Sequence, residues 1–176
     1  MLNLLYFHHF IIVRKWFTKE ESKEHSITLR GVPLERKSFK SFLGDFRYTK
    51  FPLEEGKPVS QQLEGLVEEC RRIIPQQTFN WSWVQRYMKG QNVSWHLDPA
   101  NTVGGTLVCV FGDFKGGIVN VEGQRAHVRP GDVYFLRCKL FKEGLLAERK
   151  KMEMPWHCVS KIEEGERLVL MFSELT

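Results

Sequence analysis

The spacing of hydrophobic and polar residues divides the chain into a helical part and a strand-forming part. Between residues 58 and 74 apolar side chains recur at the spacings of an amphipathic helix, and Pro58 suits its first turn. From about residue 79 the pattern changes to short runs separated by turn sequences such as GDFKGG, VEGQ and RPGD. We predict strands near residues 79–87, 92–98, 105–111, 117–121, 125–129, 132–137, 156–161 and 167–173.

This order of elements predicts an α+β fold in which N-terminal helices flank a closed or two-sheet β core. We expect a single domain over residues 1–176, with flanking elements in 1–78 and the β core in 79–176. The apolar start MLNLLYFHHFIIV has no basic n-region and no small-residue cleavage site, and it is too short to span a bilayer. We therefore expect it to be an ordered part of a soluble protein without a membrane partner.

The composition is that of an ordinary globular protein, with 42% hydrophobic and 27% charged residues, which argues against a disordered chain. The formal net charge is +5, and this moderately basic balance permits a nucleic-acid partner without requiring one. The four cysteines form no CxxC pair, so neither a disulfide framework nor a zinc knuckle is indicated. We expect a reducing, intracellular compartment, either nuclear or cytoplasmic.

The stretch VSWHLDPAN contains the first candidate chemistry. Within residues 93–98 apolar and polar side chains alternate with the period of two that is typical of a half-buried strand. This alternation predicts that His96 and Asp98 lie side by side on one face of the strand. A titratable pair on one face is either solvated or part of a site, and a further ligand decides between these interpretations.

Two histidines are candidates for that further ligand. His127 directly precedes the RPGD turn, where an exposed histidine is the ordinary expectation, whereas His157 lies in the predicted strand PWHCVS. Arg167 follows His157 by ten residues, and a turn at EEGE would place both on adjacent antiparallel strands that face inward. Two histidines and a carboxylate on one face of a metal are the ligands of non-heme Fe(II) oxygenases. A nearby buried arginine would pair with the far carboxylate of a dicarboxylate such as 2-oxoglutarate.

The motifs WHLD, GDFKGG, RPGDVYFL and HCVSKIEEGER, in this order, resemble the double-stranded β-helix (jelly-roll) of Fe(II)/2-oxoglutarate-dependent dioxygenases. The resemblance covers roughly residues 79–173 and implies His96, Asp98 and His157 as the iron ligands. It further implies Arg167 as the partner of 2-oxoglutarate, O2 as the second cosubstrate, and ascorbate as a candidate reductant. The stretch RCKLFKEGLLAERKKMEMP between RPGD and His157 looks like an insertion and leaves His127 open as the third ligand.

Two subfamilies supply further expectations. FNWSWVQRYMKGQNVSWHLD resembles the AlkB-type nucleic-acid demethylases, which implies that Tyr87 contacts 2-oxoglutarate and that part of residues 1–78 forms a substrate lid. HLDPAN resembles the TET/JBP group, which oxidises the 5-methyl group of pyrimidines, and implies Asn101 as a base contact, although DPAN also suits a plain turn. The short spacing from His157 to Arg167 fits the TET/JBP group better than AlkB, and RLVLMFSELT lacks the second arginine of AlkB.

These resemblances predict a dioxygenase that acts on a nucleic-acid base, with DNA favoured over RNA and 5-methylcytosine among the candidate bases. Lys150 and Lys151 belong to a basic stretch, residues 137–151, that we expect to hold phosphates, although a solvated loop has the same composition. A protein (prolyl-type) or small-molecule hydroxylase is the alternative, because prolyl hydroxylases share the GER ending. A non-catalytic binding module would require the loss of a metal ligand. We expect the protein to be a monomer.

Overall fold

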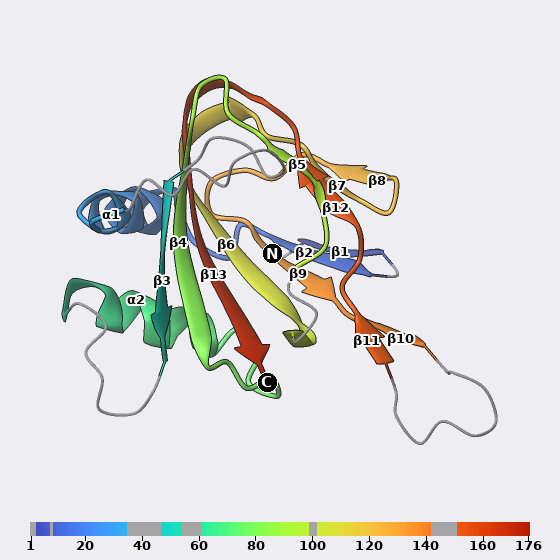
Figure 1. Cartoon of the computed structure of the whole chain (residues 1–176). Coiled ribbons are helices and arrows are strands. Elements are labelled where there is room, and N and C mark those ends of the chain that lie inside the picture. Colours follow the sequence, from blue (N-terminus) through green and yellow to red (C-terminus); the bar gives the residue numbers. More distant parts are fainter. Residues whose placement is uncertain (1–2, 8, 35–46, 54–60, 99–101, 142–150) are drawn as a thin grey trace.

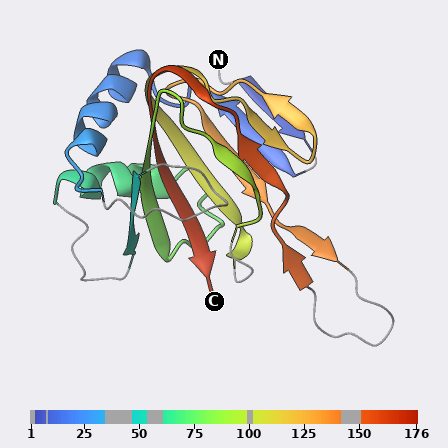
Figure 2. The same ribbon diagram turned by 45° about the horizontal axis from the view of Figure 1, so that its top comes forward.

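The structure, a computed structural model, describes residues 3–7, 9–34, 47–53, 61–98, 102–141 and 151–176. Two antiparallel sheets face each other, and a short two-stranded ribbon extends from them (Figure 1, Figure 2). The major sheet has the strand order β1 (Asn3–Phe7), β2 (Phe10–Arg14), β9 (Val133–Arg137), β6 (Thr102–Gly116), β13 (Ile162–Leu175), β4 (Trp81–Met88) and β3 (Arg47–Pro52). The minor sheet has the order β5 (Val93–His96), β12 (His157–Val159), β7 (Val119–Val121) and β8 (Gln124–Ala126). The ribbon consists of β10 (Lys139–Phe141) and β11 (Lys151–Glu153).

The helices α1 (Lys19–Arg30) and α2 (Gln61–Arg71) both lie on the side of the major sheet that faces away from the minor sheet (Figure 1). The major sheet is therefore buried on both faces, and the alternation of strand residues supplies both cores. On β6, Leu107, Cys109 and Phe111 pack in the core beneath the helices, whereas Val108 and Val110 pack in the core between the sheets. The predicted α+β fold, the helix within residues 58–74 and the run of strands after residue 79 are confirmed.

The N-terminal part of the chain contributes strands as well as helices. Strands β1 and β2 form a hairpin that pairs through β2 with β9, and β3 pairs with β4 at the opposite edge of the major sheet. Phe10 and Ile12 are fully buried, which accounts for the apolar character of these two positions. Neither described helix combines the length and apolar character that crossing a bilayer requires. The β core therefore also includes strands from residues 1–78.

Helix α1 has no apolar stripe that would reveal it in the sequence. Thr18 caps its N-terminus, because its hydroxyl accepts a hydrogen bond from the backbone N–H of Glu21 while the Glu21 carboxylate accepts one from that of Thr18. The face against β6 is made largely of small side chains, and Ser22 and Ser26 are buried there. Ser26 accepts a hydrogen bond from the backbone N–H of Gly112. Small buried serines allow a close approach of helix and sheet but leave no hydrophobic periodicity.

The RPGD turn ties the N-terminal hairpin to the core. Asp132 is buried, and its carboxylate forms an ion pair with Arg14 at 2.6 Å. The same carboxylate accepts hydrogen bonds from the backbone N–H groups of Lys15 and Arg129. These three partners satisfy a charge that would be costly to bury alone.

The EEGE sequence is not the turn that we predicted, because β13 runs without a break from Ile162 to Leu175. Gly165 lies inside this strand at φ +75°, where a Cβ atom would come within 2.0 Å of the Asp113 carbonyl oxygen. The chain instead leaves the minor sheet after Val159 and enters the major sheet at Ile162. His157 and Arg167 therefore lie on two facing sheets and not on paired strands.

We expect Gly165→Ala to destabilise the protein more than Gly90→Ala does. Both glycines have positive φ, which costs an alanine about 1–2 kcal/mol, but only Gly165 has backbone atoms in the space of the new methyl group. Overpacking adds about 1–3 kcal/mol at such a site. Urea unfolding of the two variants measures the difference in the free energy of unfolding, and equal losses would contradict the crowding at Gly165.

Candidate metal centre

Three potential metal ligands come together where the minor sheet faces the major sheet. His96 is the last residue of β5, Asp98 follows two residues later, and His157 begins β12. The ligand atoms of these side chains all lie within 4.8 Å of one another. The Asp98 Oδ1 atom is 3.6 Å from Nε2 of His96 and 3.5 Å from Nε2 of His157. Two imidazoles and one carboxylate that converge in this way can hold a divalent transition metal.

A β-bulge turns His96 toward its partners. His157 pairs with His96, and Val159 pairs with Val93. The interval between the two pairs therefore contains one more residue on β5 than on β12, which defines a β-bulge. Val93 and His96 consequently both line the same cavity, while Trp95 is 48% exposed. The strict alternation that we predicted for residues 93–98 is therefore wrong, because the bulge changes its phase and the strand ends at His96. His96 and Asp98 still reach the same cavity.

Both histidines are held in the tautomer that a metal requires. The Nδ1 atom of His96 lies 2.8 Å from the carbonyl oxygen of Ser94, and that of His157 lies 2.8 Å from the carbonyl oxygen of Pro155. A carbonyl oxygen only accepts hydrogen bonds, so each Nδ1 carries the proton and donates it. The lone pair of a neutral ring then remains on Nε2, the atom that points toward Asp98.

The electrostatics of the cluster favour a negative carboxylate. Burial by itself would raise the pKa of Asp98, but His157 and His96 outweigh it and hold this pKa well below its usual range. Burial lowers the pKa of His157, while the Asp98 carboxylate and the Pro155 carbonyl raise it, and the net shift is upward. Asp98 is thus ionised at neutral pH and available as a metal ligand.

The second oxygen of Asp98 is bound to the major sheet. Asp98 Oδ2 accepts a hydrogen bond of 3.0 Å from the Thr106 hydroxyl, which lies 2.9 Å from the hydroxyl of Ser173. Thr106 on β6 and Ser173 on β13 are direct partners in the antiparallel register, and both are buried. The carboxylate is therefore fixed on both sides, by the histidines at Oδ1 and by Thr106 at Oδ2.

Arg167 is a buried cation that faces the same cavity from β13. Its side chain is 1% exposed, and it donates a hydrogen bond of 3.3 Å to the Tyr134 hydroxyl. Its guanidinium carbon lies 5.4 Å from the centre of the Tyr87 ring. Among the described residues, no carboxylate forms an ion pair with Arg167, and its Nε has no hydrogen-bond partner. A buried guanidinium without an acidic partner is costly, so this end of the cavity suits an anionic ligand.

Two tyrosines surround the guanidinium. Burial raises the pKa of both Tyr87 and Tyr134, so their phenols stay protonated at neutral pH. The Tyr87 hydroxyl donates to Oε1 of Gln85. The Tyr134 oxygen accepts from Arg167, which leaves its proton free to be donated to another group. Together with Arg167, Tyr134 can therefore offer hydrogen-bond donors to a carboxylate.

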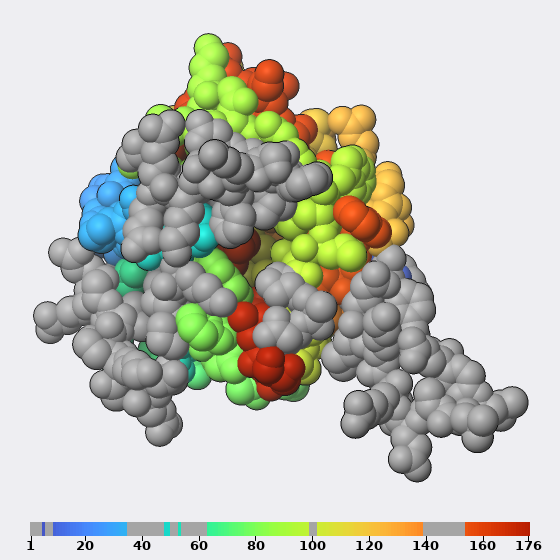
Figure 3. Space-filling view, in the orientation of Figure 1, coloured from blue at the N-terminus to red at the C-terminus, as the bar shows by residue number. Residues whose placement is uncertain are grey.

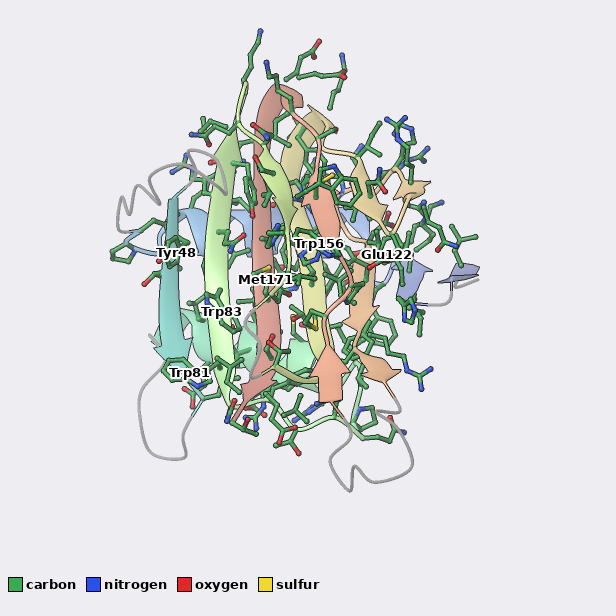
Figure 4. All side chains as sticks on the ribbon, turned by 45° about the vertical axis from the view of Figure 1, so that its right-hand side comes forward. Tyr48, Trp81, Trp83, Glu122, Trp156 and Met171 are labelled. Atoms are coloured by element: carbon green, nitrogen blue, oxygen red, sulfur yellow. The ribbon has the colours of Figure 1, made fainter. Side chains whose placement is uncertain are left out.

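The metal ligands and Arg167 line one cavity of about 520 Å³ between the two sheets. A hollow on this face of the molecule is visible between the sheets in Figure 3. The side chains of Tyr48, Trp83 and Met171 also line the cavity and come from the neighbouring strands β3, β4 and β13 (Figure 4). The cavity therefore combines a candidate metal centre, a cationic end and an aromatic wall.

The structure places most of the predicted site residues, and some lie outside the described residues. His96, Asp98, His157, Tyr87 and Arg167 line the one cavity. Asn101 and Lys150 lie outside the described residues, as does the side chain of Lys151, whose backbone begins β11. His127 is exposed and is not part of the described metal-ligand cluster, so the geometry favours His157 as the third ligand. Sequence reasoning missed Thr106, Ser173 and Tyr134, because no motif marks a hydroxyl whose partner lies on another strand.

Comparison with known proteins shows the fold. No family model and no curated protein matches the sequence. Among solved structures, an oxidoreductase of the 2OG-Fe(II) oxygenase family from Burkholderia pseudomallei is similar, with a TM-score of 0.66, 14% identity, and coverage of 94% of this chain and 84% of the other.

Two further structures cover nearly the whole of both chains. The viral collagen prolyl hydroxylase from Paramecium Bursaria Chlorella virus-1, in its 2OG complex, has a TM-score of 0.64 and 12% identity, with 94% of each chain covered. OsALKBH1 has a TM-score of 0.64 and 12% identity, with 97% of this chain and 100% of the other covered. The chain thus shares the fold of these solved structures.

We expect His157→Ala to weaken metal binding at least tenfold and His127→Ala to leave it unchanged. Of these two histidines, only His157 places an imidazole nitrogen within reach of Asp98 and His96. Calorimetric titration of the chelator-treated protein with Mn(II) measures both dissociation constants. Loss of binding in His127→Ala with retention in His157→Ala would reverse the assignment.

Proposed function

We propose that the protein is an Fe(II)- and 2-oxoglutarate-dependent dioxygenase that hydroxylates a C–H bond of its substrate. One observation carries this conclusion: two histidines, a carboxylate and a buried arginine, which has no acidic partner among the described residues, face a single cavity. The two facing antiparallel sheets support the predicted double-stranded β-helix, and the similar solved structures include a member of the 2OG-Fe(II) oxygenase family. The candidate metal ligands and Arg167 would supply the chemistry within that shared fold.

The residues present fit both groups that this chemistry needs. His96, Asp98 and His157 would hold Fe(II) through Nε2, one carboxylate oxygen and Nε2, which leaves positions open for other ligands. Arg167 would hold the far carboxylate of 2-oxoglutarate, since its Nε has no partner among the described residues. Bound Fe(II), with 2-oxoglutarate and O2, would supply the oxidant, and the cosubstrates would leave as succinate and CO2 while the substrate gains one oxygen atom.

The side chains of this protein would position the cosubstrate and the substrate and would exclude water from the site. Arg167 and Tyr134 orient the cosubstrate at the buried end of the cavity, and the Tyr87 ring covers the guanidinium. Val108, Val159 and Val169 line the cavity and are buried, so much of the cavity wall is apolar. Such a surface limits the access of water to the reacting C–H bond and fixes the substrate near the metal.

For the substrate we favour a nucleic-acid base, by oxidation of a 5-methylpyrimidine or by N-demethylation. Tyr48 and Trp83 give the cavity an aromatic wall on which a base can stack, and the net charge of +5 suits a polyanion. The fold of OsALKBH1, an AlkB homologue, is compatible with this choice. The predicted roles of Asn101 in base contact and of Lys150 and Lys151 in phosphate binding remain part of the proposal.

A prolyl-type protein hydroxylase is the second candidate. The observation that favours it is the similarity to the viral collagen prolyl hydroxylase, which covers 94% of each chain. A proline ring packs well on aromatic side chains, so the wall formed by Tyr48 and Trp83 suits it too. The two candidates differ in the polymer that carries the oxidised group, and a direct product assay separates them.

We expect the iron-loaded protein to convert 2-oxoglutarate to succinate and to add oxygen to methylated DNA. The assay incubates the protein with Fe(II), 2-oxoglutarate and, separately, methylated DNA, methylated RNA, methylated nucleosides and a proline-rich peptide. Mass spectrometry detects the products, and Asp98→Ala is the control, because it removes a ligand. An oxidised peptide alone would replace the nucleic-acid proposal by the prolyl one. Absence of succinate with every substrate would overturn the dioxygenase itself.

We expect Arg167→Lys to raise the apparent KM for 2-oxoglutarate about 10- to 100-fold. Lysine keeps the charge but loses the planar fork that binds a carboxylate through two hydrogen bonds, which are worth about 1.5–3 kcal/mol each. The exposed Arg125 on β8 provides the matched control Arg125→Lys, which should leave KM unchanged. Succinate formation at varied 2-oxoglutarate measures both values. An unchanged KM in Arg167→Lys would exclude Arg167 from this role.

A further inference from the structure

We propose that Thr106, supported by Ser173, is a positioning residue that orients the Asp98 carboxylate toward the metal and thereby sets the affinity of the metal centre. The inference rests on the metal centre of the proposed function, and it concerns a part of that centre that comes from the major sheet. It assigns a role to two buried hydroxyl groups that lie outside the ligand set.

The hydrogen bonds in this group have a fixed direction. An ionised carboxylate only accepts, so the single Thr106 proton goes to Asp98 Oδ2 at 3.0 Å. The Thr106 oxygen, 2.9 Å from the Ser173 hydroxyl, must then accept from it. The result is a directed chain from Ser173 through Thr106 to Asp98. Hydrogen bonds to an ionised group are the stronger kind, and little water competes here because Thr106 and Ser173 are 3% and 2% exposed.

The chain determines which oxygen of Asp98 a metal can use. Oδ1 is the atom that lies 3.5–3.6 Å from both Nε2 atoms, and Oδ2 is directed away from the histidines to Thr106. Rotation of the carboxylate toward a two-oxygen contact with a metal would break the bond to Thr106. Thr106 therefore favours binding through one oxygen, which preserves open coordination positions for further ligands.

Asp98 needs such support because its own segment provides little. It lies beyond the end of β5, outside the ladder that holds His96. Thr106 and Ser173, by contrast, are paired in register within the long β6–β13 ladder. Asp98 has no backbone pairing in the minor sheet. The hydrogen bond from Thr106 thus anchors its carboxylate to the paired strands of the major sheet.

The same strand offers a control for ordinary burial of a threonine. Thr102 is also on β6 and also 3% exposed, but its hydroxyl has no hydrogen-bond partner among the described residues. If Thr106 only filled space in the core, Thr106→Val and Thr102→Val would affect the protein alike. A positioning role predicts that the two variants differ in metal binding.

The test measures binding of Mn(II) and Co(II) to the chelator-treated protein by calorimetry, with the visible absorption of bound Co(II) as a report on coordination. We expect Thr106→Val to weaken binding about 10- to 100-fold, the usual effect of removing a group that orients a metal ligand, and to change the Co(II) spectrum. Thr106→Ser should restore both, since it keeps the hydroxyl. Ser173→Ala should weaken binding less, and Thr102→Val should bind as the unchanged protein does.

Each outcome decides the proposal. Equal affinities and spectra for Thr106→Val and Thr102→Val would overturn it, as would a Thr106→Ser variant as weak as Thr106→Val. If Thr106→Val does not fold, Ser173→Ala decides, because normal binding in that variant contradicts the directed chain. Failure of the unchanged protein to bind either metal would overturn the metal centre and this inference together. Metal binding without turnover of 2-oxoglutarate would overturn only the proposed function.

Discussion

The antiparallel ladder between β6 and β13 is the constraint on which the rest of the structure depends. It runs from the pairing of Ile162 with Gly116 to that of Leu175 with Thr102, and it forms the centre of the major sheet. Arg167 lies near the middle of this ladder and Ser173 near its C-terminal end, six residues apart, or about 20 Å of extended strand. The Arg167 side chain reaches back toward Tyr134, which pairs with Val108 of β6. The ladder thereby fixes both the anion-binding end of the cavity and the support for the metal centre.

Opposite charges face one cavity without forming an ion pair with each other. The Asp98 carboxylate is stabilised by two histidines and Thr106, while the Arg167 guanidinium lies near tyrosine and phenylalanine rings and has no acidic partner in the described part of the chain. A direct ion pair would satisfy both groups but would leave neither for a ligand. The next residue on β13, Glu166, faces the opposite side and pairs with Arg30 of α1 and Arg86 of β4. Because successive side chains of a strand point to opposite faces, Glu166 forms ion pairs on the other side of the sheet, while Arg167 remains available to a ligand in the cavity.

The site assembles from segments whose local sequence does not fix their orientation. A bulge in β5 brings His96 to the face of Val93, and this rotation places Trp95 outside, against the alternation of the sequence. Thr106 and Tyr134 contact predicted site residues but are marked by no sequence pattern, although both belong to strands that the sequence did predict. Their partners, Asp98 and Arg167, are 8 and 33 residues away along the chain. Such partners are set by strand pairing, which short-range spacing does not encode.

The sequence by itself determined the class of the fold, the amphipathic helix α2, most of the strands after residue 79 and the residue types of the candidate site. These features follow from local periodicity, turn residues and the chemistry of His and Asp side chains, all of which act within a few residues. Only the tertiary structure decided that β13 continues through Gly165, that Ser22 and Ser26 pack helix α1 on β6, and that His157 rather than His127 meets Asp98. Each of these depends on contacts between segments distant in the chain, where packing and register outweigh local preference.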